Sequence, residues 1–237
     1  MPASYQEGPF GHNFTSIITP GNLMYLPAHF KEERLAVIHE LIRGHPLGTL
    51  VTLGPQGLNG NHMPFEVVPD PVPFGTLRAH VARANPVWRE FSRDVDALAI
   101  FQGPQAYVTP AWYPTKQEHG KVVPTWNYLV VHAYGPLRVI EDKAWLRGFV
   151  EGLTNRFEAG RADPWKITDA PDDYIDRQLA AIVGIEIPVT QLLGKWKVSQ
   201  NRLPADREAI ARAFKERSGV GDLAMGEWVQ NSVTGDQ

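Results

Sequence analysis

The chain has 237 residues, of which 43% are apolar and 21% charged, and it carries a net charge of −3 and no cysteine. This composition is ordinary for a globular protein with a buried core. The absence of cysteine excludes disulfides, iron–sulfur clusters and cysteine nucleophiles and favours a reducing compartment. The acidic balance weighs against a dedicated nucleic-acid-binding protein, which usually has a basic excess.

No targeting segment is evident. The first residues, MPASYQEGPFGHNF, lack the basic and apolar regions of a signal peptide. No stretch approaches the roughly 20 apolar residues that a membrane helix needs. We therefore expect a soluble, cytoplasmic protein with no membrane contact.

The N-terminal half is predicted to begin with an irregular arm at 1–23, where glycines and prolines break any pattern. A helix follows, because Leu35, Ile38 and Leu41 recur at helical spacing, and Gly44 and Pro46 end it. Two strands at 47–53 and 58–68 are joined by a Gly-Pro-Gln-Gly turn, which indicates a hairpin.

A third strand is indicated by the alternation of Leu77, Ala79 and Val81, and a short helix begins at Asn85-Pro86. The remaining predicted elements are a strand over 97–110 that is interrupted at Gly103-Pro104, a loop at 113–122, the longest strand signal at 123–140, helices at 143–157 and 172–183, a last strand at 184–198, a helix at 205–217 and a tail of little pattern at 218–237.

Antiparallel strands closed into a barrel suit this order better than alternating βαβ units. The expected fold is therefore mainly β with flanking helices (α+β), in one domain over 24–217.

Several chemistries leave no motif in the sequence. There is no GxGxxG after a strand, no P-loop, no HExxH and no GxSxG. The eight histidines are scattered without the spacing of a metal site, so we expect none.

Four stretches at strand ends combine aromatic with polar side chains: GNHMPFE, LRAHVARANPVW, VPTWNYLVVH and GKWKVSQNR. A strand interior normally alternates apolar and solvated residues, whereas these side chains suit a flat heteroaromatic ligand. Arg83, Lys197 and Arg202 are placed to bind a phosphate. Taken singly, each residue also has a structural interpretation, with the histidines as satisfied polar groups and Trp126 and Trp196 as core.

Together with MYLPAHF (24–30) and YVTPAWYPTK (107–116), these stretches resemble the PaiB family of FMN-binding negative transcriptional regulators, over residues 24 to about 215. The resemblance implies an antiparallel split β-barrel related to pyridoxamine-phosphate oxidases and flavin reductases. It also implies a homodimer with FMN at each subunit contact.

By analogy with that fold, the FMN-binding residues come from four places. The third-strand exit supplies phosphate contacts, the first hairpin and the long strand face the ring system, and the segment after the last strand reaches across from the partner subunit. The implied residues are, in that order, His80, Arg83, Asn85 and Trp88; Thr49, Thr52, Asn61 and His62; Trp126, Asn127 and Tyr128; and Lys197, Ser199, Gln200, Asn201 and Arg202.

Three functions stay open. The first is an FMN-dependent oxidoreductase, such as a flavin reductase or a haem-degrading oxygenase, with His62, His80 or His132 able to carry a proton near neutral pH. The second is a transcriptional regulator, for which the helix at 205–217 is the only plausible DNA-binding element. The third is an interaction protein without a cofactor.

Overall fold

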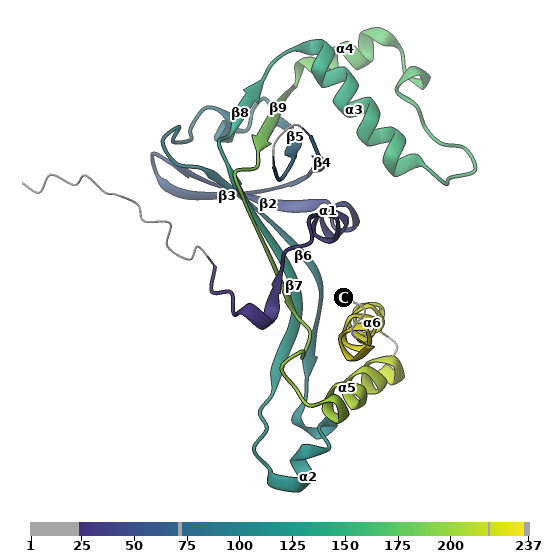
Figure 1. Ribbon diagram of the computed structural model, residues 1–237. Coiled ribbons are helices and arrows are strands. Elements are labelled where there is room, and N and C mark those ends of the chain that lie inside the picture. Colours follow the sequence, from purple (N-terminus) through teal and green to yellow (C-terminus); the bar gives the residue numbers. More distant parts are fainter. Residues whose placement is uncertain (1–23, 71–72, 218, 235–237) are drawn as a thin grey trace, which may run out of the picture.

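The structure is a computed structural model that describes residues 24–70, 73–217 and 219–234. The arm predicted at 1–23 lies outside these residues. Two antiparallel sheets carry the fold (Figure 1). The larger has six strands in the order β1 (Lys31–Glu32), β10 (Gln191–Lys197), β7 (Thr125–Gly135), β6 (Ala97–Val108), β2 (Leu47–Gly54) and β3 (Gly57–Pro64). The smaller has four, in the order β4 (Glu66–Val68), β5 (Thr76–Ala82), β9 (Ile182–Pro188) and β8 (Arg138–Ile140).

The helices surround these sheets. They are α1 (Leu35–Gly44), α2 (Thr115–His119), α3 (Lys143–Glu158), α4 (Asp172–Ala180), α5 (Pro204–Arg217) and α6 (Val220–Thr234), with 3-10 turns η1 (Ala28–Phe30), η2 (Pro86–Trp88), η3 (Pro110–Trp112) and η4 (Ile167–Asp169). The mainly β architecture with flanking helices confirms the predicted fold class. None of the described helices has the length and apolar character to cross a bilayer.

Three predicted strands prove to be pairs of strands in different sheets. The segment 58–68 divides into β3 and β4, 123–140 into β7 and β8, and 184–198 into β9 and β10. Each division falls at or next to a proline, at Pro64, Pro136 and Pro188. Because proline has no N–H to donate, the ladder ends there and the chain turns into the other sheet. These three corners wrap the sheets around one core.

The largest core cluster fills the space that the sheets enclose. Leu77 and Ala79 of β5 point into it and are fully buried. Phe65, at the first corner, packs edge-to-face on Phe101 of β6, with the ring centroids 5.4 Å apart. The alternation that predicted these strands therefore reflects one buried face.

Two other expectations need correction. The interruption predicted at Gly103-Pro104 does not end the strand: β6 continues, and only its pairing with β7 is interrupted there, by a register shift between Gln102 and Gln105. This bulge brings Gly103 against Leu41 of α1. The loop predicted at 113–122 contains α2, which ends at Gly120 in the left-handed conformation.

The C-terminal segment also differs from the patternless tail that the sequence indicates. Most of it forms α6, which packs on α5 and against β6. Met225 and Val229 of α6 are fully buried. The apolar pattern is weak because this helix also contains small residues, such as Ala224 and Gly226 on either side of Met225.

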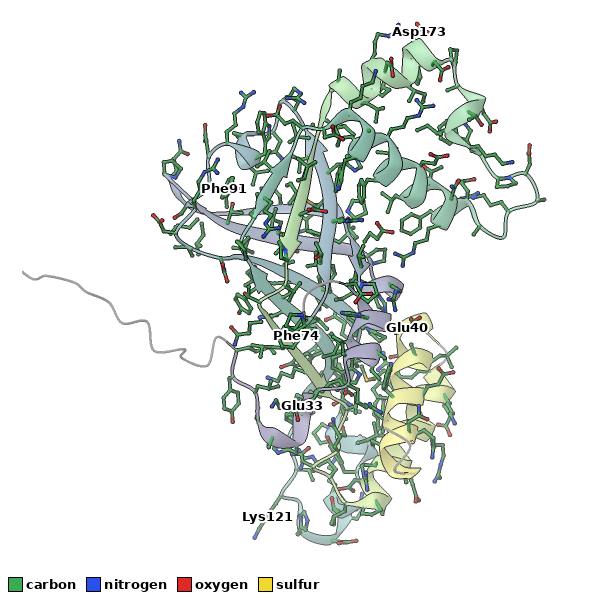
Figure 2. The ribbon with its side chains drawn as sticks, turned by 45° about the horizontal axis from the view of Figure 1, so that its top comes forward. Glu33, Glu40, Phe74, Phe91, Lys121 and Asp173 are labelled. Atoms are coloured by element: carbon green, nitrogen blue, oxygen red, sulfur yellow. The ribbon has the colours of Figure 1, made fainter. Side chains whose placement is uncertain are left out.

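Helices α3 and α4 form a helical insertion between β8 and β9. It has a small core of its own, made by Leu146, Ile167, Ile175 and Leu179. Trp145 of α3 attaches this insertion to the barrel. Its indole N–H donates to Glu186 of β9 at 3.3 Å, and its ring packs on Gly184. Asp173 on α4 and Lys121 after α2 lie at opposite ends of the molecule (Figure 2).

Candidate functional site

One face of the six-stranded sheet is left open. Helices α1, α5 and α6 all lie on the same side of β6 and β7 (Figure 1). On β7 the alternate residues from Trp126 to Tyr134 are half-buried or exposed, whereas the residues between them are buried. The same alternation runs through β2 and β6. We call this the open face.

The open face carries large apolar and aromatic side chains. Those most exposed are Leu47, Leu53, Leu58, Tyr107 and Trp126. Trp126 is 54% exposed and packs edge-to-face on Tyr107 at 5.9 Å. Exposed apolar area that continues across several strands is typical of a surface that a ligand or another chain covers.

The strand register places two predicted residues in one row on this face. His62 lies opposite Thr49, and the row continues through Ile100 and His132 to Leu193. Burial lowers the pKa of His132, and the positive charge of Lys195 lowers it further. We call this end of the open face the hairpin end.

Trp126, Tyr128 and Lys197 lie on the same face at its other end, which we call the turn end. Lys197 is opposite Tyr128 in the ladder. Trp126 and His132 are six residues apart along β7, which corresponds to roughly 20 Å at 3.3 Å per residue. The structure thus gathers the predicted residues into two groups rather than one.

Thr52 and Asn127 belong to the opposite, buried face. Asn127 is fully buried and bonds to Ser199, whereas the Thr52 hydroxyl is buried without a hydrogen-bond partner within the described part of the chain. Neither side chain reaches the open face. Asn127 therefore influences the turn end only through its hydrogen bonds to Ser199, which hold the turn in place.

The turn after β10 is tightly built. Ser199 has a left-handed backbone, with φ of 66°. Gln200 accepts a hydrogen bond from the Val198 N–H at 2.8 Å and donates to the carbonyl of Trp196. The side-chain amide of Gln200 therefore makes both of these hydrogen bonds within the turn.

A polar cavity of about 40 Å³ lies inside this turn. It is large enough for one small group. Five of the predicted residues and Thr125 line it: Asn127, Lys197, Ser199, Asn201 and Arg202. The Arg202 guanidinium lies over the Tyr113 ring, 5.1 Å from its centroid.

Two neighbouring lysines make the turn end strongly cationic. Lys195 is 7% exposed, donates to the Tyr25 carbonyl at 2.9 Å and lies between the rings of Tyr25 and Tyr128. Burial lowers the pKa of Lys197, with smaller contributions from the charges of Lys195 and Arg202. None of these three cations has an ion-pair partner among the described residues.

Lys195 was not among the sequence-predicted residues. The signal that identifies it is its spacing, since it lies two residues before Lys197 and therefore shares its face. A buried lysine without a carboxylate is rare in proteins. Here the Tyr25 carbonyl and the two tyrosine rings take the place of a carboxylate.

Beside the hairpin end, Asn61 and Asn85 join β3 to the turn after β5. The Asn85 amide donates to the Asn61 side-chain oxygen at 2.8 Å and accepts from the Val87 N–H at 3.0 Å. The latter bond caps η2, as Asn before Pro86 favours.

Arg83 is held firmly in this turn. Its guanidinium donates to Glu141 at 2.6 Å, to the carbonyl of Ala180 at 2.9 Å and to that of Ile182 at 3.1 Å. Trp88 donates to the Arg83 carbonyl at 3.0 Å. Because a guanidinium has five N–H donors, Arg83 keeps some for a ligand.

His80 is separate from both groups. It lies with Arg78 on the side of β5 that faces α3, and its ring packs edge-to-face on Phe149 at 5.8 Å. Its Nδ1 is buried without a hydrogen-bond partner in the described residues, and burial lowers its pKa. The side chain is part of the contact between α3 and the barrel.

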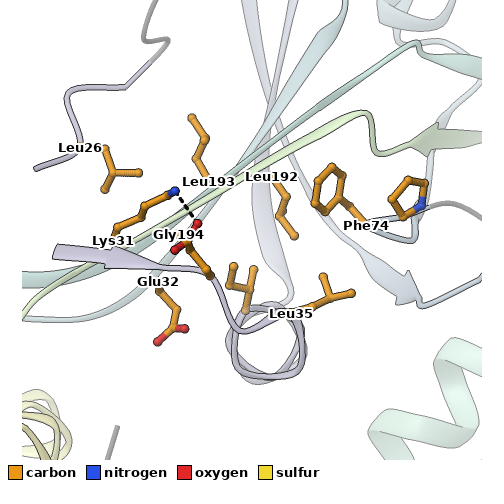
Figure 3. A pocket seen from close by; sticks show the side chains of 11 residues that line it. Leu26, Lys31, Glu32, Leu35, Phe74, Leu192, Leu193 and Gly194 are labelled. Carbon is orange, nitrogen blue, oxygen red and sulfur yellow. Dashed lines mark hydrogen bonds and ion pairs between the residues drawn. The ribbon is translucent and has the colours of Figure 1, made fainter. Parts of the chain in front are cut away.

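Another hollow, of about 410 Å³, lies between α1 and β10 (Figure 3). Leu35, Phe74 and Leu192 give it apolar walls, and Lys31 and Glu32 lie at its edge. No predicted residue lines it. No group of three or more His, Asp or Glu side chains suited to a metal occurs in the described parts of the chain.

A family model described as "Putative FMN-binding domain" matches residues 24–191. The chain belongs to this family. Among its relatives, an uncharacterized protein of Emericella nidulans is 33% identical over 81% of this chain and 90% of that protein. The Bacillus subtilis protease synthase and sporulation protein PAI 2 is 29% identical over 89% of this chain and 98% of its own. The PaiB resemblance is confirmed.

The FMN-binding family shares its fold with solved split barrels. The FAD and heme binding protein of Mycobacterium smegmatis superposes with a TM-score of 0.52 at 17% identity, over 70% of this chain and 73% of that one. The split-barrel prediction is therefore confirmed, and FMN is the cofactor of this domain. The residues fit such a ligand, since the open face offers aromatic walls and its turn end has cations without carboxylates.

Proposed function

We propose that this chain is a homodimeric, FMN-dependent oxidoreductase in which each flavin lies between the open faces of two subunits. The observation that carries the proposal is the open face itself, with its large apolar side chains and a group of predicted ligands at each end. A stable dimer buries about 800 Å² on each subunit. A face spanning six strands has room for such a contact.

The distance between the two ends favours a shared site. They are roughly 20 Å apart along the strands, and the predicted ligands lie on different strands as well, so one ring system does not reach both in one chain. A two-fold axis through the middle of the open face brings the turn end of one subunit over the hairpin end of its partner. The Lys197–Arg202 segment then reaches across the interface.

The two subunits contribute different side chains to each site. Arg83, with Asn85 beside it, binds the phosphate, because its remaining N–H donors are fixed in direction by the three bonds described above. Thr49 and His62 line the ring on the same subunit. Trp126 covers it from the partner, and Lys197 and Arg202 place positive charge near its polar edge. Asn127, Ser199 and Gln200 hold these groups in position, and Tyr128 and Asn201 complete the turn end.

FMN supplies the redox chemistry, because the flavin accepts and releases electrons and hydride. The protein positions it, shields it from water and provides a group that exchanges protons. His132 lies in the row with His62 and, with its pKa lowered, stays neutral at pH 7 and able to accept a proton. Burial also lowers the pKa of Lys197.

The FMN-binding unit that we propose spans residues 24–217, in a cytoplasmic protein. Helix α6 (Val220–Thr234) follows this unit. The interaction protein without a cofactor is set aside, since the chain belongs to an FMN-binding family.

A regulator that binds DNA directly finds less support. In α5 the residues Ile210 and Phe214 are fully buried, so only one side of this helix is free. Arg207 donates to the Ser232 carbonyl, and Arg217 pairs with Asp222 of α6 at 3.2 Å. The cations of α5 are thus partly used within the fold, which leaves little for phosphate neutralisation.

The proposal is tested by loading the purified chain with FMN, removing free flavin on a sizing column and adding NADH or NADPH without oxygen. We expect flavin absorbance to elute with a dimer and to bleach on reduction. Binding of an operator fragment with steep salt dependence, together with a flavin that no electron donor reduces, would favour the regulator instead.

A further inference from the structure

The connection from β6 to β7 contains a segment, 109–116, that supplies no group to the flavin site proposed above. It folds into η3 and the start of α2. Pro110 and Pro114 restrict its backbone, because the proline ring fixes φ. Thr109 caps η3 by accepting a hydrogen bond from the Ala111 N–H at 3.3 Å. The local backbone is therefore well determined.

Two contacts join this segment to α5. Asp206, in the first turn of α5, is 3% exposed and accepts from the Thr115 N–H at 3.3 Å and from the Thr115 hydroxyl at 2.9 and 3.1 Å. The Trp112 ring packs edge-to-face on Phe214, with the ring centroids 5.1 Å apart. Helix α2 and the start of α5 therefore lie side by side at one end of the molecule (Figure 1).

A third contact reaches the turn end itself, through Tyr113 and Arg202. Tyr113 is 2% exposed, and the Arg202 guanidinium lies 5.1 Å from the centroid of its ring. The Tyr113 hydroxyl is buried and has no hydrogen-bond partner in the described part of the chain. The contact with the guanidinium is therefore made by the ring.

The ring is the main group that orients the Arg202 side chain. The turn fixes the backbone, because the Arg202 N–H donates to the Ser199 carbonyl at 2.9 Å. Over residues 24–70, 73–217 and 219–234, no carboxylate pairs with this arginine. Both oxygens of Asp206 accept from Thr115 instead. Stacking on an aromatic ring orients a guanidinium and leaves its charge available to a ligand.

We propose that Tyr113 is a positioning residue of the flavin site, whose ring holds the Arg202 guanidinium at the turn end. This inference rests on the proposed function, in which Arg202 places positive charge near the polar edge of the flavin. It adds to that site a residue that touches neither flavin nor substrate and acts only through Arg202.

The position of this charge affects two measurable properties of the bound flavin. A cation near the polar edge strengthens binding, and it favours the reduced flavin, which has the greater negative charge there. Displacing the Arg202 guanidinium should therefore weaken FMN binding and lower the reduction potential of the bound flavin. Neither property is a measure of activity.

The experiment compares four variants of the full chain: Arg202→Gln, Tyr113→Leu, Tyr113→Phe and the double variant Tyr113→Leu/Arg202→Gln. Quenching of free FMN fluorescence gives the affinity, and equilibration with a redox dye without oxygen gives the potential. Arg202→Gln should weaken FMN binding about tenfold and lower the potential. Tyr113→Leu should weaken binding at least about threefold and also lower the potential.

Two further results distinguish positioning from a general effect on folding. Tyr113→Phe keeps the ring and should behave as the wild type. The double variant should bind FMN no more weakly than Arg202→Gln, because Tyr113 acts through that arginine. If Tyr113→Leu fails to fold, Tyr113→Met takes its place, since the flexible methionine side chain fills irregular gaps.

The matched control is Trp112→Leu. It removes the neighbouring ring of η3, which contacts Phe214 of α5 and the Arg217 guanidinium, 5.7 Å from its centroid. Trp112→Leu should leave the affinity for FMN and the reduction potential unchanged, even if urea denaturation shows a loss of stability.

The outcomes separate this inference from the proposed function. Wild-type affinity and potential in Tyr113→Leu, beside a defective Arg202→Gln, would overturn the inference and leave the flavin site intact. So would a Tyr113→Phe variant as defective as Tyr113→Leu, additive effects in the double variant, or equal losses in Trp112→Leu. An unaffected Arg202→Gln would refute the role of Arg202 at the flavin, and the inference with it. Failure of the wild type to retain FMN would refute the flavin site itself.

Discussion

Ser199 and Asn127 exchange two hydrogen bonds in the interior of the turn end. The Asn127 amide donates to the Ser199 hydroxyl at 3.0 Å, and the hydroxyl donates to the Asn127 oxygen at 3.1 Å. Their positions differ by 72 residues in the chain. The pair fastens the turn that carries Lys197 and Arg202 to the end of β7.

Ser199→Ala should destabilise the chain by about 1–3 kcal/mol, because it leaves the buried Asn127 amide without its partner. Ser199→Gly loses the same bonds but accepts the left-handed backbone without strain, so it should be less harmful by about 1 kcal/mol. Urea denaturation monitored by tryptophan fluorescence measures both. Equal stability of the alanine variant and the wild type would show that the pair contributes nothing.

Arg83→Ala should weaken FMN binding by tenfold or more, because it removes a charge-assisted contact worth about 1.5–3 kcal/mol. Glu141→Gln removes the ion pair and keeps the guanidinium, so its FMN affinity should stay the same or rise. Fluorescence quenching of free FMN measures both affinities. Unchanged affinity in Arg83→Ala would refute the phosphate assignment.

Stability should fall as the pH is lowered from 7.5 to 5.5. Burial lowers the pKa of His80 in the folded chain, whereas in the unfolded chain it titrates near its ordinary value of about 6.5. Below that value the unfolded chain binds the proton first, and the neutral-state stabilisation is lost as the pH falls toward the folded pKa. His80→Gln should therefore reduce the difference in unfolding free energy between the two pH values.

The control for this measurement is the exposed His119, whose replacement by Gln should leave the pH dependence as in the wild type. Urea denaturation of the apo-protein at each pH gives the free energies. A pH dependence identical in His80→Gln and wild type would contradict the burial argument.

Val130→Glu should separate the subunits, because Val130 lies half-buried near the middle of the open face. A charge there costs little in the monomer but is desolvated in the dimer. We expect sedimentation to show a monomer that no longer retains FMN. Val95→Glu, an exposed site outside the two sheets, is the matched control. A dimeric Val130→Glu variant would place the interface elsewhere.

Much of the fold is predictable from periodicity. The apolar spacing of α1, the alternation of β5 and the proline-led start of η2 are local signals, and the structure confirms them. The corners at Pro64, Pro136 and Pro188 are harder to predict. A segment that crosses from one sheet to the other keeps a strand-like composition throughout.

The site is less predictable, because its geometry depends on contacts between distant segments. Sequence motifs selected Arg83 as a polar residue at a strand exit, but the carbonyls that hold it belong to Ala180 and Ile182, nearly a hundred residues away. His80 looked similar in the sequence and instead faces Phe149 of α3. The strand register distinguishes Arg83 from His80, and it can be assigned only when the pairing of the strands is known.

The most direct test of a flavin site shared by two subunits is complementation between Arg83→Ala and Lys197→Ala. Each homodimer should fail to retain FMN. The heterodimer, isolated through two different affinity tags, has one intact site and one doubly defective site if Arg83 and Lys197 act from opposite subunits, so it should retain about one FMN per dimer. If both residues act within one subunit, every site in the heterodimer lacks one of them, and a colourless heterodimer would contradict the account.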